Sequence, residues 1–452
     1  MLEIVILAAG KGTRMRSDHP KVMHLLAGKP FLEHVLDCAE TLKPQKIHVV
    51  VGHGAEQVKQ YFCHQDLNFV HQTEQLGTGH AVQQAMPSVS PESTVLILYG
   101  DVPLISHDTL AHLVSQVSSD SMALLTVQLD NPQGYGRILR DDKGSAIGIV
   151  EQKDATKEQL TIDEVNTGVM AVPAVLLNEW LPTLKNTNVQ GEYYLTDIVA
   201  LASEQNIAVN TASAASESEV LGVNNRMQQA QLERCYQMSV AQSLMESGAT
   251  LMDPNRLDVR GDLTVGKDCV IDINCVFEGQ VKLGDNVSIG PNCIIQNSSI
   301  GDGCDIKANS IIEDSQLQNN CSVGPFARLR PGTILERQAK IGNFVETKKA
   351  HIGEGSKVNH LSYVGDAIIG KAVNIGAGTI TCNYDGVNKS LTEIEDNVFI
   401  GSNTALVAPV KISKDATIGA GSTITKSVAD KQLAVARQRQ INIDGWQRPV
   451  KK

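Results

Sequence analysis

The stretch 283–306, LGDNVSIGPNCIIQNSSIGDGCDI, has an aliphatic residue at every sixth position. Leu283, Ile289 and Ile295 set the period, which resumes at Ile300 after a slip of one residue. Glycine follows several of the aliphatic residues, and a small residue often stands four positions after them. A sixfold apolar period is typical of a parallel β-helix, in which each unit buries one side chain against the next coil.

The same period extends in both directions from this stretch, from Val265 to Ile424, with more than twenty units in near register. This extent predicts a β-helix over most of the second half of the chain. The period breaks at Thr381–Glu393 (TCNYDGVNKSLTE), where we expect an insertion to leave the coil. Insertions in solenoids often contain functional residues.

Five of the nine cysteines occupy the small position of the repeat. The sequence contains no CxxC pair, and the odd, irregular set argues against a disulfide framework or a zinc site. We therefore expect these five to be small buried hydrophobic residues. They are Cys269, Cys275, Cys293, Cys304 and Cys321.

The first 225 residues follow a different pattern, because short apolar runs alternate with amphipathic stretches. This alternation predicts an α/β domain with a mainly parallel sheet, whose ligands bind at the carboxyl ends of the strands. The expected strands are Ile4–Leu7, Ile47–Val51, Val95–Tyr99, Ala123–Val127 and Gly168–Val172. Expected helices between them include Phe31–Leu42 and Gly79–Ala85.

The segment Arg226–Ser247 contains neither glycine nor proline, and Gly248 follows it as a plausible C-terminal cap. Four apolar residues recur at a spacing of four on one face: Leu232, Tyr236, Val240 and Leu244. We therefore expect a linker helix over 226–247, between one domain at 1–225 and a second at 248–452.

Composition restricts the class of protein. The chain has 452 residues, 42% of them hydrophobic, and no apolar run approaches the ~20 residues of a membrane helix. The N-terminus has an acidic residue, Glu3, where a signal peptide would be basic, so we expect a cytoplasmic protein without a membrane partner. Residues 1–225 contain 14 Lys/Arg against 26 Asp/Glu, which is a poor surface for nucleic acid.

A glycine-rich segment, Leu7–Met15 (LAAGKGTRM), directly follows the first expected strand. Its small residues allow backbone N–H groups to approach a phosphate, and Lys11 and Arg14 add positive charge. It is not a Walker A loop, because GxxxxGK[ST] is absent. On its own it is also compatible with a plain strand-to-helix turn. Pro20-Lys21, Gln72–Thr78 (QTEQLGT) and Tyr99–Pro103 (YGDVP) follow downstream.

Together these segments resemble the sugar-nucleotide pyrophosphorylases. With the hexapeptide half attached, the whole chain is similar to the bifunctional family that joins an N-acetylglucosamine-1-phosphate uridyltransferase to a glucosamine-1-phosphate acetyltransferase. Further matches are Tyr135-Gly136-Arg137, Glu151, Asn166-Thr167-Gly168 and Gly222-Val223-Asn224-Asn225. The resemblance implies an α/β Rossmann-like nucleotidyltransferase domain followed by a left-handed parallel β-helix.

The resemblance also implies the reactions. Acetyl-CoA acetylates glucosamine-1-phosphate, and UTP then transfers uridylyl to N-acetylglucosamine-1-phosphate with release of pyrophosphate. The product, UDP-N-acetylglucosamine, is used for peptidoglycan and lipopolysaccharide. Uridylyl transfer needs no protein base, since the attacking phosphate is already an anion, so positioning and charge neutralisation supply most of the catalysis.

For this first site the resemblance implies that Asp101 and Asn224 hold Mg²⁺, and that Lys21 and Arg14 are catalytic through contact with the phosphates. One carboxylate together with phosphate oxygens and waters is a usual environment for Mg²⁺. The contacts implied for UTP or the sugar nucleotide are Leu7, Ala8, Ala9, Gly10, Lys21, Gln72, Gly77, Thr78, Tyr99, Gly100, Asp101, Gly136, Glu151, Asn166 and Asn224.

For acetyl transfer the resemblance implies His360, in KVNHLSYVGD, as the base. Histidine suits proton removal near neutrality, although any single histidine is more often a packed or surface residue. The implied glucosamine-1-phosphate contacts are Arg330, Lys348, Tyr363, Asn374 and Lys389. The implied acetyl-CoA contacts are Ala377, Asn383, Tyr384, Ser402, Ala420 and Arg437.

β-Helix acyltransferases of this kind are homotrimers with active sites between subunits, so the resemblance implies that state here. Two other readings remain. The chain could be a single-activity pyrophosphorylase with a regulatory β-helix, which would lack the acetyl-site residues. It could also be a non-catalytic assembly protein, which would be expected to lose Lys21, Asp101 or Asn224; all three are present.

Overall fold

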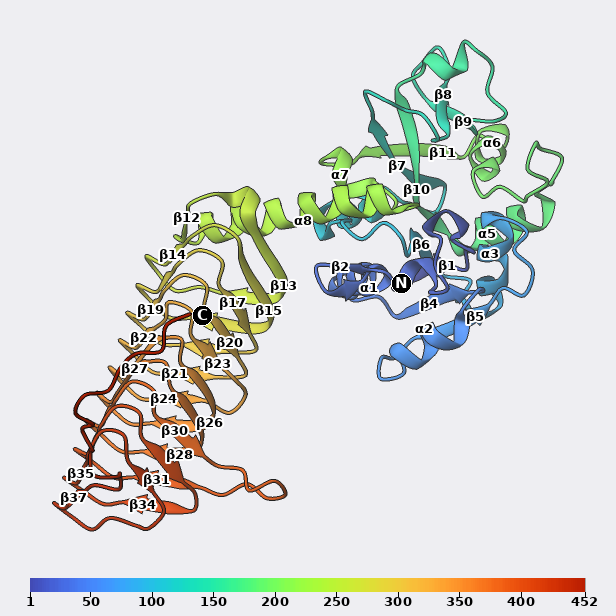
Figure 1. The fold of residues 1–452 in the computed structure, drawn as a ribbon. Helices are drawn as coiled ribbons and strands as arrows, with labels where there is room; N and C mark the ends of the chain where they lie inside the picture. Colours follow the sequence, from blue (N-terminus) through green and yellow to red (C-terminus); the bar gives the residue numbers. More distant parts are fainter. Residues whose placement is uncertain (452) are drawn as a thin grey trace. The chain divides into compact units, whose positions relative to one another are not determined.

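The computed structural model describes residues 1–451. The chain forms two compact units, Met1–Tyr236 and the remainder from Gln237 onward (Figure 1). The first unit is an α/β fold, and the second is a left-handed parallel β-helix, as the sequence predicts.

The first unit is built on one sheet. Its principal strands are β1 (Leu2–Ala8), β4 (Lys46–Val51), β5 (Asn68–His71), β6 (Thr94–Tyr99), β7 (Ser121–Gln128), β10 (Glu164–Pro173) and β11 (Ala208–Ser213). Their order is β11-β7-β10-β6-β1-β4-β5, and a hairpin of β8 (Arg137–Arg140) and β9 (Ala146–Val150) joins β10. All neighbours in the order pair parallel except β10, which is antiparallel to β6 and β7. The mainly parallel sheet is therefore confirmed.

Helices cover both faces of this sheet, because alternate strand residues belong to different cores. On β1, Ile4 and Ile6 belong to one core, whereas Val5 and Leu7 belong to the other. Such burial on both faces explains the continuous apolar runs of the strands. The first core receives α1 (Phe31–Thr41), α2 (Ala55–Tyr61) and α4 (His107–Ser115), and the second receives α3 (Thr78–Ala85), α5 (Ala174–Trp180) and α6 (Asp197–Glu204).

The strand order changes direction at β1. This strand pairs with β4 on one side and with β6 on the other, and both pairings are parallel. The chain builds β4 and β5 on one side and then crosses to β6 on the other. The loops after β1 and β6 therefore diverge at the carboxyl edge, which is where ligands bind in such sheets.

Helix α8 (Arg226–Glu246) occupies the stretch for which the sequence predicts one long helix. Leu232, in its first half, packs in a small core of the first unit with Phe31 and Val223. Ala241 and Leu244, in its second half, belong to the core of the β-helix. The preceding short helix is α7 (Glu217–Val220).

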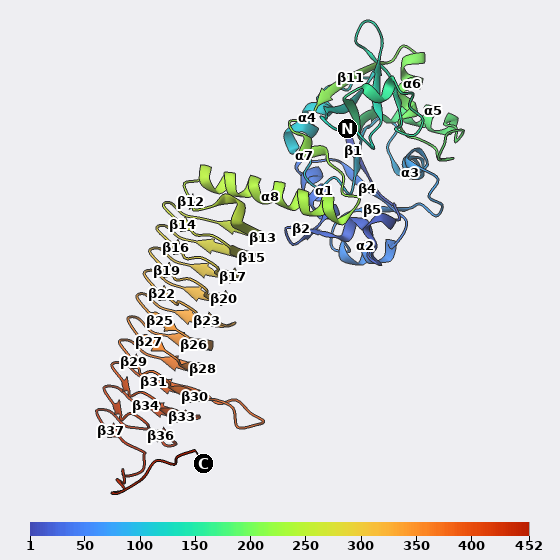
Figure 2. The same cartoon turned by 45° about the horizontal axis from the view of Figure 1, so that its top comes forward.

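The β-helix stacks short parallel strands in successive coils (Figure 2). One sheet contains β12 (Thr250–Leu251), β14 (Val270–Ile271), β16 (Ser288–Ile289), β19 (Asp305–Ile306), β22 (Ser322–Val323), β25 (Lys340–Asn343), β27 (Lys357–His360), β29 (Asn374–Ile375), β32 (Phe399–Ile400), β35 (Thr417–Ile418) and β37 (Leu433–Ala434). The other contains β13 (Leu257–Thr264), β15 (Cys275–Leu283), β17 (Ile294–Gln296), β18 (Ser299–Ile300), β20 (Ile311–Glu313), β21 (Gln316–Leu317), β23 (Arg328–Leu329), β24 (Ile334–Leu335), β26 (Glu346–Ile352), β28 (Tyr363–Ile369), β30 (Ile380–Cys382), β31 (Thr392–Ile394), β33 (Ala405–Val407), β34 (Val410–Ile412) and β36 (Thr423–Ile424).

The register of the coils explains the slips in the sixfold period. Ile271 pairs with Ile289, which is 18 residues later, whereas Ile289 pairs with Ile306, which is 17 later. A slip is therefore a coil shortened by one residue, and the repeat itself continues. Phe277 is 1% exposed and fills a core position that a search for aliphatic residues skips.

Threonines occupy two further core positions that the apolar period misses. Thr347 Oγ1 lies 3.0 Å from Thr333 Oγ1, and Thr381 Oγ1 donates to the Gly365 carbonyl at 3.0 Å. Because each hydroxyl finds a partner inside the coil, burying it is tolerated.

The insertion is shorter than the predicted break at Thr381–Glu393. Thr381 and Thr392 are both buried within strands, and the excursion spans 383–391 (Figure 2). The prediction was too wide because these threonines are small enough to fill core positions. All five cysteines of the repeat are buried and free, as expected.

Candidate active sites

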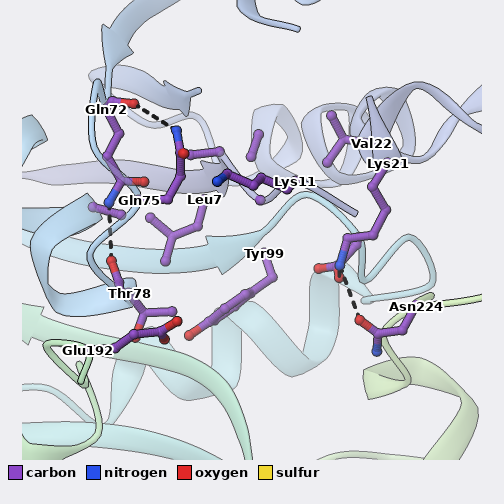
Figure 3. Close-up of a pocket in the computed structure, with 16 residues that line it drawn as sticks. Leu7, Lys11, Lys21, Val22, Gln72, Gln75, Thr78, Tyr99, Glu192 and Asn224 are labelled. Atoms are coloured by element: carbon purple, nitrogen blue, oxygen red, sulfur yellow. Dashed lines mark hydrogen bonds and ion pairs between the residues drawn. The ribbon is translucent and has the colours of Figure 1, made fainter. Parts of the chain in front are cut away.

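A cavity of about 550 Å³ lies at the carboxyl edge of the first unit, where the strand order changes direction. Its lining comes mainly from the segments that follow β1, β5 and β6, with α3 beside them (Figure 3). Most residues that the resemblance implies for UTP line it: Leu7, Ala8, Ala9, Gly10, Lys21, Gln72, Gly77, Thr78, Tyr99, Asp101 and Asn224.

Cationic side chains and oxygen atoms converge at one end of this cavity. The Lys21 ammonium forms an ion pair with the Asp101 carboxylate and donates to Asn224 Oδ1 at 3.2 Å (Figure 3). Arg14 also donates to Asn224 Oδ1, at 2.8 Å, from a short helical turn (Thr13–Met15) at the end of the glycine-rich segment. The four predicted phosphate and metal residues therefore lie together, although they are up to 210 positions apart in the sequence.

The opposite end of the cavity is formed by Gln72 and the start of α3. Gln72 is 3% exposed, and its amide donates to the Gly77 carbonyl at 3.2 Å. Gly77 has φ 115°, and a Cβ there would stand 2.6 Å from the backbone of Tyr193. Only glycine fits this turn, so the turn fixes both the helix start and the Gln72 amide.

Tyr99 lies between the two ends of the cavity (Figure 3). Burial raises the pKa of the Tyr99 phenol, and the nearby carboxylates of Glu151 and Asp101 raise it further. The phenol is therefore neutral at physiological pH. Gly168 packs closely on this ring, since a Cβ there would stand 2.5 Å from Tyr99 Cε2.

The residues predicted to hold the acetamido sugar lie together beside the main cavity. The Asn166 N–H donates to the Gly136 carbonyl at 2.9 Å, and a Cβ on Gly136 would stand 3.5 Å from the Glu151 carboxyl carbon. Glu151 lines a second cavity of about 350 Å³ and accepts a hydrogen bond from Thr196. Burial raises the pKa of Glu151, with smaller contributions from neighbouring carboxylates.

Sequence reasoning missed four residues that line the main cavity: the apolar Val22 and Ala81 and the polar Gln75 and Glu192. Gln75 belongs to the QTEQLGT segment, and its amide donates to the Gln72 carbonyl at 3.2 Å. Glu192 reaches the cavity from the segment before α6. Gln75 was within a quoted motif and could have been found, whereas nothing local distinguishes Glu192. Gly100, which does not line the cavity, ties β6 to β1 through a bond to the Leu7 carbonyl.

In the second unit, His360 ends β27 and stacks on residues of neighbouring coils. The Asn343 side chain lies in the coil before it, and the Oδ1–Nδ1 distance is 2.6 Å. Backbone bonds continue the stack through the later coils, from Gly378 to His360, from Asn403 to Ala377 and from Gly421 to Ser402. The stack therefore aligns His360 with three of the predicted acetyl-CoA contacts: Ala377, Ser402 and Ala420.

Three predicted phosphate contacts form a cationic cluster on the adjoining face. The neighbouring Lys389 ammonium, followed by the Arg330 guanidinium, lowers the pKa of Lys348. Lys389 comes from the insertion, whereas Arg330 and Lys348 belong to successive coils. Glu346 forms an ion pair with Arg330 at 2.8 Å. Like charges held this close favour an anionic ligand.

The remaining predicted contacts surround this face. Tyr363 and Asn374 are half-buried on β28 and β29. Asn383 is buried and donates to Asp366 at 2.5 Å, which anchors the insertion, whereas Tyr384 is 59% exposed. The Arg437 guanidinium donates to the Ala420 carbonyl at 2.6 Å, which brings two predicted acetyl-CoA contacts together.

Metal and membrane features are limited. Among residues 1–451, no group of three or more His, Cys, Asp or Glu side chains is arranged to hold a metal ion. A cation at Asp101 and Asn224 would therefore need oxygen atoms from a ligand as well.

No helix in the described part of the chain is long and apolar enough to cross a membrane.

Family models match three parts of the chain. A MobA-like NTP transferase domain matches residues 4–185. A GMPPB C-terminal domain matches residues 259–340. A bacterial transferase hexapeptide model of six repeats matches residues 391–426. These matches agree with a nucleotidyltransferase unit followed by a hexapeptide β-helix.

Relatives match over the full length. The protein named Bifunctional protein GlmU from Saccharophagus degradans is 67% identical over 452 residues, covering 100% of both chains. That of Cellvibrio japonicus is 60% identical over 452 residues, again covering 100% of both. That of Marinobacter nauticus is 59% identical over 450 residues, covering 100% of this chain and 99% of the relative.

Proposed function

This chain belongs to the GlmU family of bifunctional proteins, and from that premise we propose how its two sites work. The protein transfers an acetyl group from acetyl-CoA to glucosamine-1-phosphate. It then transfers uridylyl from UTP to N-acetylglucosamine-1-phosphate and releases pyrophosphate. One observation above all supports the residue roles. The predicted residues form two separate clusters, one around Asn224 in the first unit and one around His360 in the second.

We propose that uridylyl transfer occurs in the cavity of the first unit. A phosphate oxygen of the sugar substrate attacks the α-phosphorus of UTP, and the bond from that phosphorus to the departing pyrophosphate breaks. Lys21 and Arg14 neutralise the phosphates from the end of the cavity where they converge. Gln72, Gly77 and Thr78 hold the uracil at the other end, which places the triphosphate between the two.

The donor set fits Mg²⁺. The Lys21 ammonium contacts both the Asp101 carboxylate and Asn224 Oδ1, so these two hard oxygen ligands already converge on one cationic group. We propose that Asp101 and Asn224 hold Mg²⁺, which would supply charge neutralisation to the triphosphate. Lys21 then leaves Asp101 and contacts a phosphate. Gly136, Glu151 and Asn166 hold the acetamido sugar.

We propose that acetyl transfer occurs on the outer face of the β-helix. Arg330, Lys348 and Lys389 bind the sugar phosphate, and Tyr363 and Asn374 orient the sugar. The imidazole of His360 takes one proton from the substrate ammonium, and the amine nitrogen attacks the thioester carbonyl carbon. The C–S bond breaks, and the proton that His360 took returns to the departing thiolate, so coenzyme A leaves as the thiol. The nitrogen loses its second proton to solvent as the amide forms. Ala377, Asn383, Tyr384, Ser402, Ala420 and Arg437 bind acetyl-CoA.

We propose that the β-helix assembles as a homotrimer, because one corner of its coils has an unfavourable backbone conformation in the single chain. Residues at this corner have left-handed backbone, and in an earlier coil the corner residue is Asn309. Beside His360 the position is held instead by Phe326, Phe344 and Leu361, with φ of 54°, 56° and 49°. Such bulky residues cost about 1 kcal/mol each in this conformation.

These three side chains are also exposed, by 51%, 55% and 63%, and the two phenylalanine rings stack with centroids 5.3 Å apart. Strain and exposed apolar surface beside a site are explained if a second copy covers them. This cover supports active sites between subunits, where Arg437 of a neighbouring copy can also contribute.

We propose functional boundaries of 1–225 for uridylyl transfer and 248–452 for acetyl transfer, joined by a helix over 226–247. Because UTP and acetyl-CoA are the co-substrates, we place the protein in the cytoplasm.

A substrate-omission assay of the purified protein tests the proposal. The mixture contains glucosamine-1-phosphate, acetyl-CoA, UTP and Mg²⁺, and each is omitted in turn. UDP-N-acetylglucosamine should form only when all four are present. If the protein uses N-acetylglucosamine-1-phosphate and UTP but never acetylates, the β-helix is regulatory and the acetyl-site roles are wrong.

A further inference from the structure

The proposed base has a defined partner on one ring nitrogen. His360 Nδ1 lies 2.6 Å from Asn343 Oδ1, on the adjoining strand of the preceding coil. A side-chain amide oxygen only accepts hydrogen bonds, so the proton of this bond belongs to Nδ1. In the neutral ring the lone pair is then on Nε2.

We propose that Asn343 is a positioning residue that holds His360 in the Nδ1–H tautomer and thereby makes Nε2 the atom that takes the substrate proton. This inference rests on the proposed base role of His360. After proton transfer both ring nitrogens carry hydrogen, and the bond to Asn343 Oδ1 persists. The imidazolium therefore keeps its orientation when it returns its proton to the departing thiolate.

The fold itself does not require an amide at position 343. Asn343 directly precedes a left-handed corner residue, and the same place in other coils is held by residues with neither an amide nor an imidazole. These are Ile273, Pro291, Ala308, Pro325, Ala377, Ser402 and Ala420. Asn343 and His360 differ from all of them, and they are adjacent in the stack. Since the coils form without an amide here, the amide is explained by its contact with the imidazole.

The orienting group is an amide, whereas many catalytic histidines are oriented by a carboxylate. The charged residues of the flanking strands are Lys340 on β25 and Lys357 on β27, each three positions before the pair. Beyond the corner, Glu346 pairs with Arg330, and Tyr363 follows on the next coil. Within residues 1–451, no carboxylate is hydrogen-bonded to His360. The amide thus fixes the tautomer without adding negative charge beside the ring.

Two substitutions at position 343 separate the effect of orienting the His360 ring from the effect of a negative charge beside it. Asn343→Ala removes the acceptor and should lower kcat for acetyl transfer by roughly tenfold to a hundredfold, with a smaller change in KM. Asn343→Asp keeps the acceptor and adds a carboxylate, which favours the protonated imidazole. In the pH profile of kcat for Asn343→Asp, the rise of kcat on the acid side should therefore move to higher pH by about one unit or more.

The controls distinguish this inference from misfolding and from failure of the base role. Uridylyl transfer should be unchanged in both variants, and Lys340→Ala on the same strand should leave the acetyl pH profile unchanged. The inference is overturned if Asn343→Ala keeps kcat within twofold, or if Asn343→Asp leaves the rise of kcat on the acid side in place. If His360→Ala itself retains acetyl transfer, the base role has failed instead.

Discussion

The two candidate sites are built in different ways. In the first unit, loops from strand ends meet at a sheet edge and enclose a cavity, so residues as distant as Arg14 and Asn224 touch. In the second, functional side chains recur at equivalent places of successive coils and lie mostly on the outside, as His360 and Tyr384 do. A sheet edge can complete a pocket within one unit, whereas a solenoid face needs another surface to enclose a ligand.

The two sites also differ in how they use charge. The first pairs its cations with nearby oxygen ligands, since Lys21 contacts both Asp101 and Asn224. The second holds Lys348 and Lys389 together, and their repulsion lowers the pKa of Lys348. The first arrangement suits the proposed metal and triphosphate, and the second suits the proposed single sugar phosphate.

The largest expected effect separates the two sites completely. His360→Gln should reduce acetyl transfer by about 10²–10⁴-fold, because the base is lost, and leave uridylyl transfer unchanged. His351→Gln is the matched control, since His351 lies on the preceding strand of the same β-helix, β26, and pairs with Glu336. Spectrophotometric detection of free thiol measures the acetyl step. An acetyl rate within tenfold of the parent would refute the base role.

The converse substitution is Lys21→Ala in the first unit. Removal of the ammonium that contacts Asp101 and Asn224 should lower uridylyl transfer by about 10²–10³-fold and spare acetyl transfer. Pyrophosphate release measures the rate. Lys59→Ala, at a half-buried surface lysine on α2, is the control. A loss of both activities to the same degree would mean that the units are not independent.

Packing in the β-helix should respond to single core truncations. Ile306 is fully buried in the stack, so Ile306→Ala should lower the free energy of unfolding by about 2–5 kcal/mol. Denaturant unfolding, followed together with both activities, measures the change. Ile368→Ala should cost far less, because that residue is 49% exposed. Equal costs for the two variants would contradict the described register.

Assembly should depend on the apolar corner. Phe344→Asn places a residue that tolerates left-handed backbone at φ 56° and removes exposed apolar surface. The protomer should remain folded, while the proposed trimer should weaken and acetyl transfer should fall several-fold. Sedimentation velocity measures the oligomer. An unchanged trimer with unchanged acetyl transfer would show that no second copy covers this corner.

The smallest effect concerns pH and stability in the first unit. Burial raises the pKa of Glu151, so its ionised form is disfavoured in the folded state. The stability associated with this group is fully present below its unfolded pKa and is lost as pH rises through its folded pKa. Glu151→Gln should therefore raise the free energy of unfolding more at pH 8 than at pH 4.

Chemical denaturation at the two pH values measures this difference. Glu56→Gln, whose carboxylate is 91% exposed, should show little difference between them. A stabilisation by Glu151→Gln that is larger at pH 4 would reverse the expected sign.

Features repeated along the chain could be predicted, and features that depend on distant contacts could not. The apolar strands of the first unit are buried on both faces, so β1, β4, β6, β7 and β10 were expected, whereas the short β5 and the polar β11 were missed. In the β-helix, Phe277 and two threonines escaped a search for aliphatic residues.

The sites divide in the same way. Linear segments such as LAAGKGTRM lead directly to the cavity. By contrast, Glu192 reaches the cavity, and Asn343 reaches His360, only through the fold. Their residue types are common, and their local sequence contains no distinguishing spacing.

A mixing experiment tests the central claim, that one chain contains two independent active sites, most directly. Asp101→Ala and His360→Ala proteins are assayed separately and together with glucosamine-1-phosphate, acetyl-CoA, UTP and Mg²⁺. Neither alone should form UDP-N-acetylglucosamine, whereas the mixture should, because the acetylated sugar phosphate made by the first variant diffuses to the second. If either variant alone forms the product, or if the mixture stays inactive although each retains its expected partial activity, the account is contradicted.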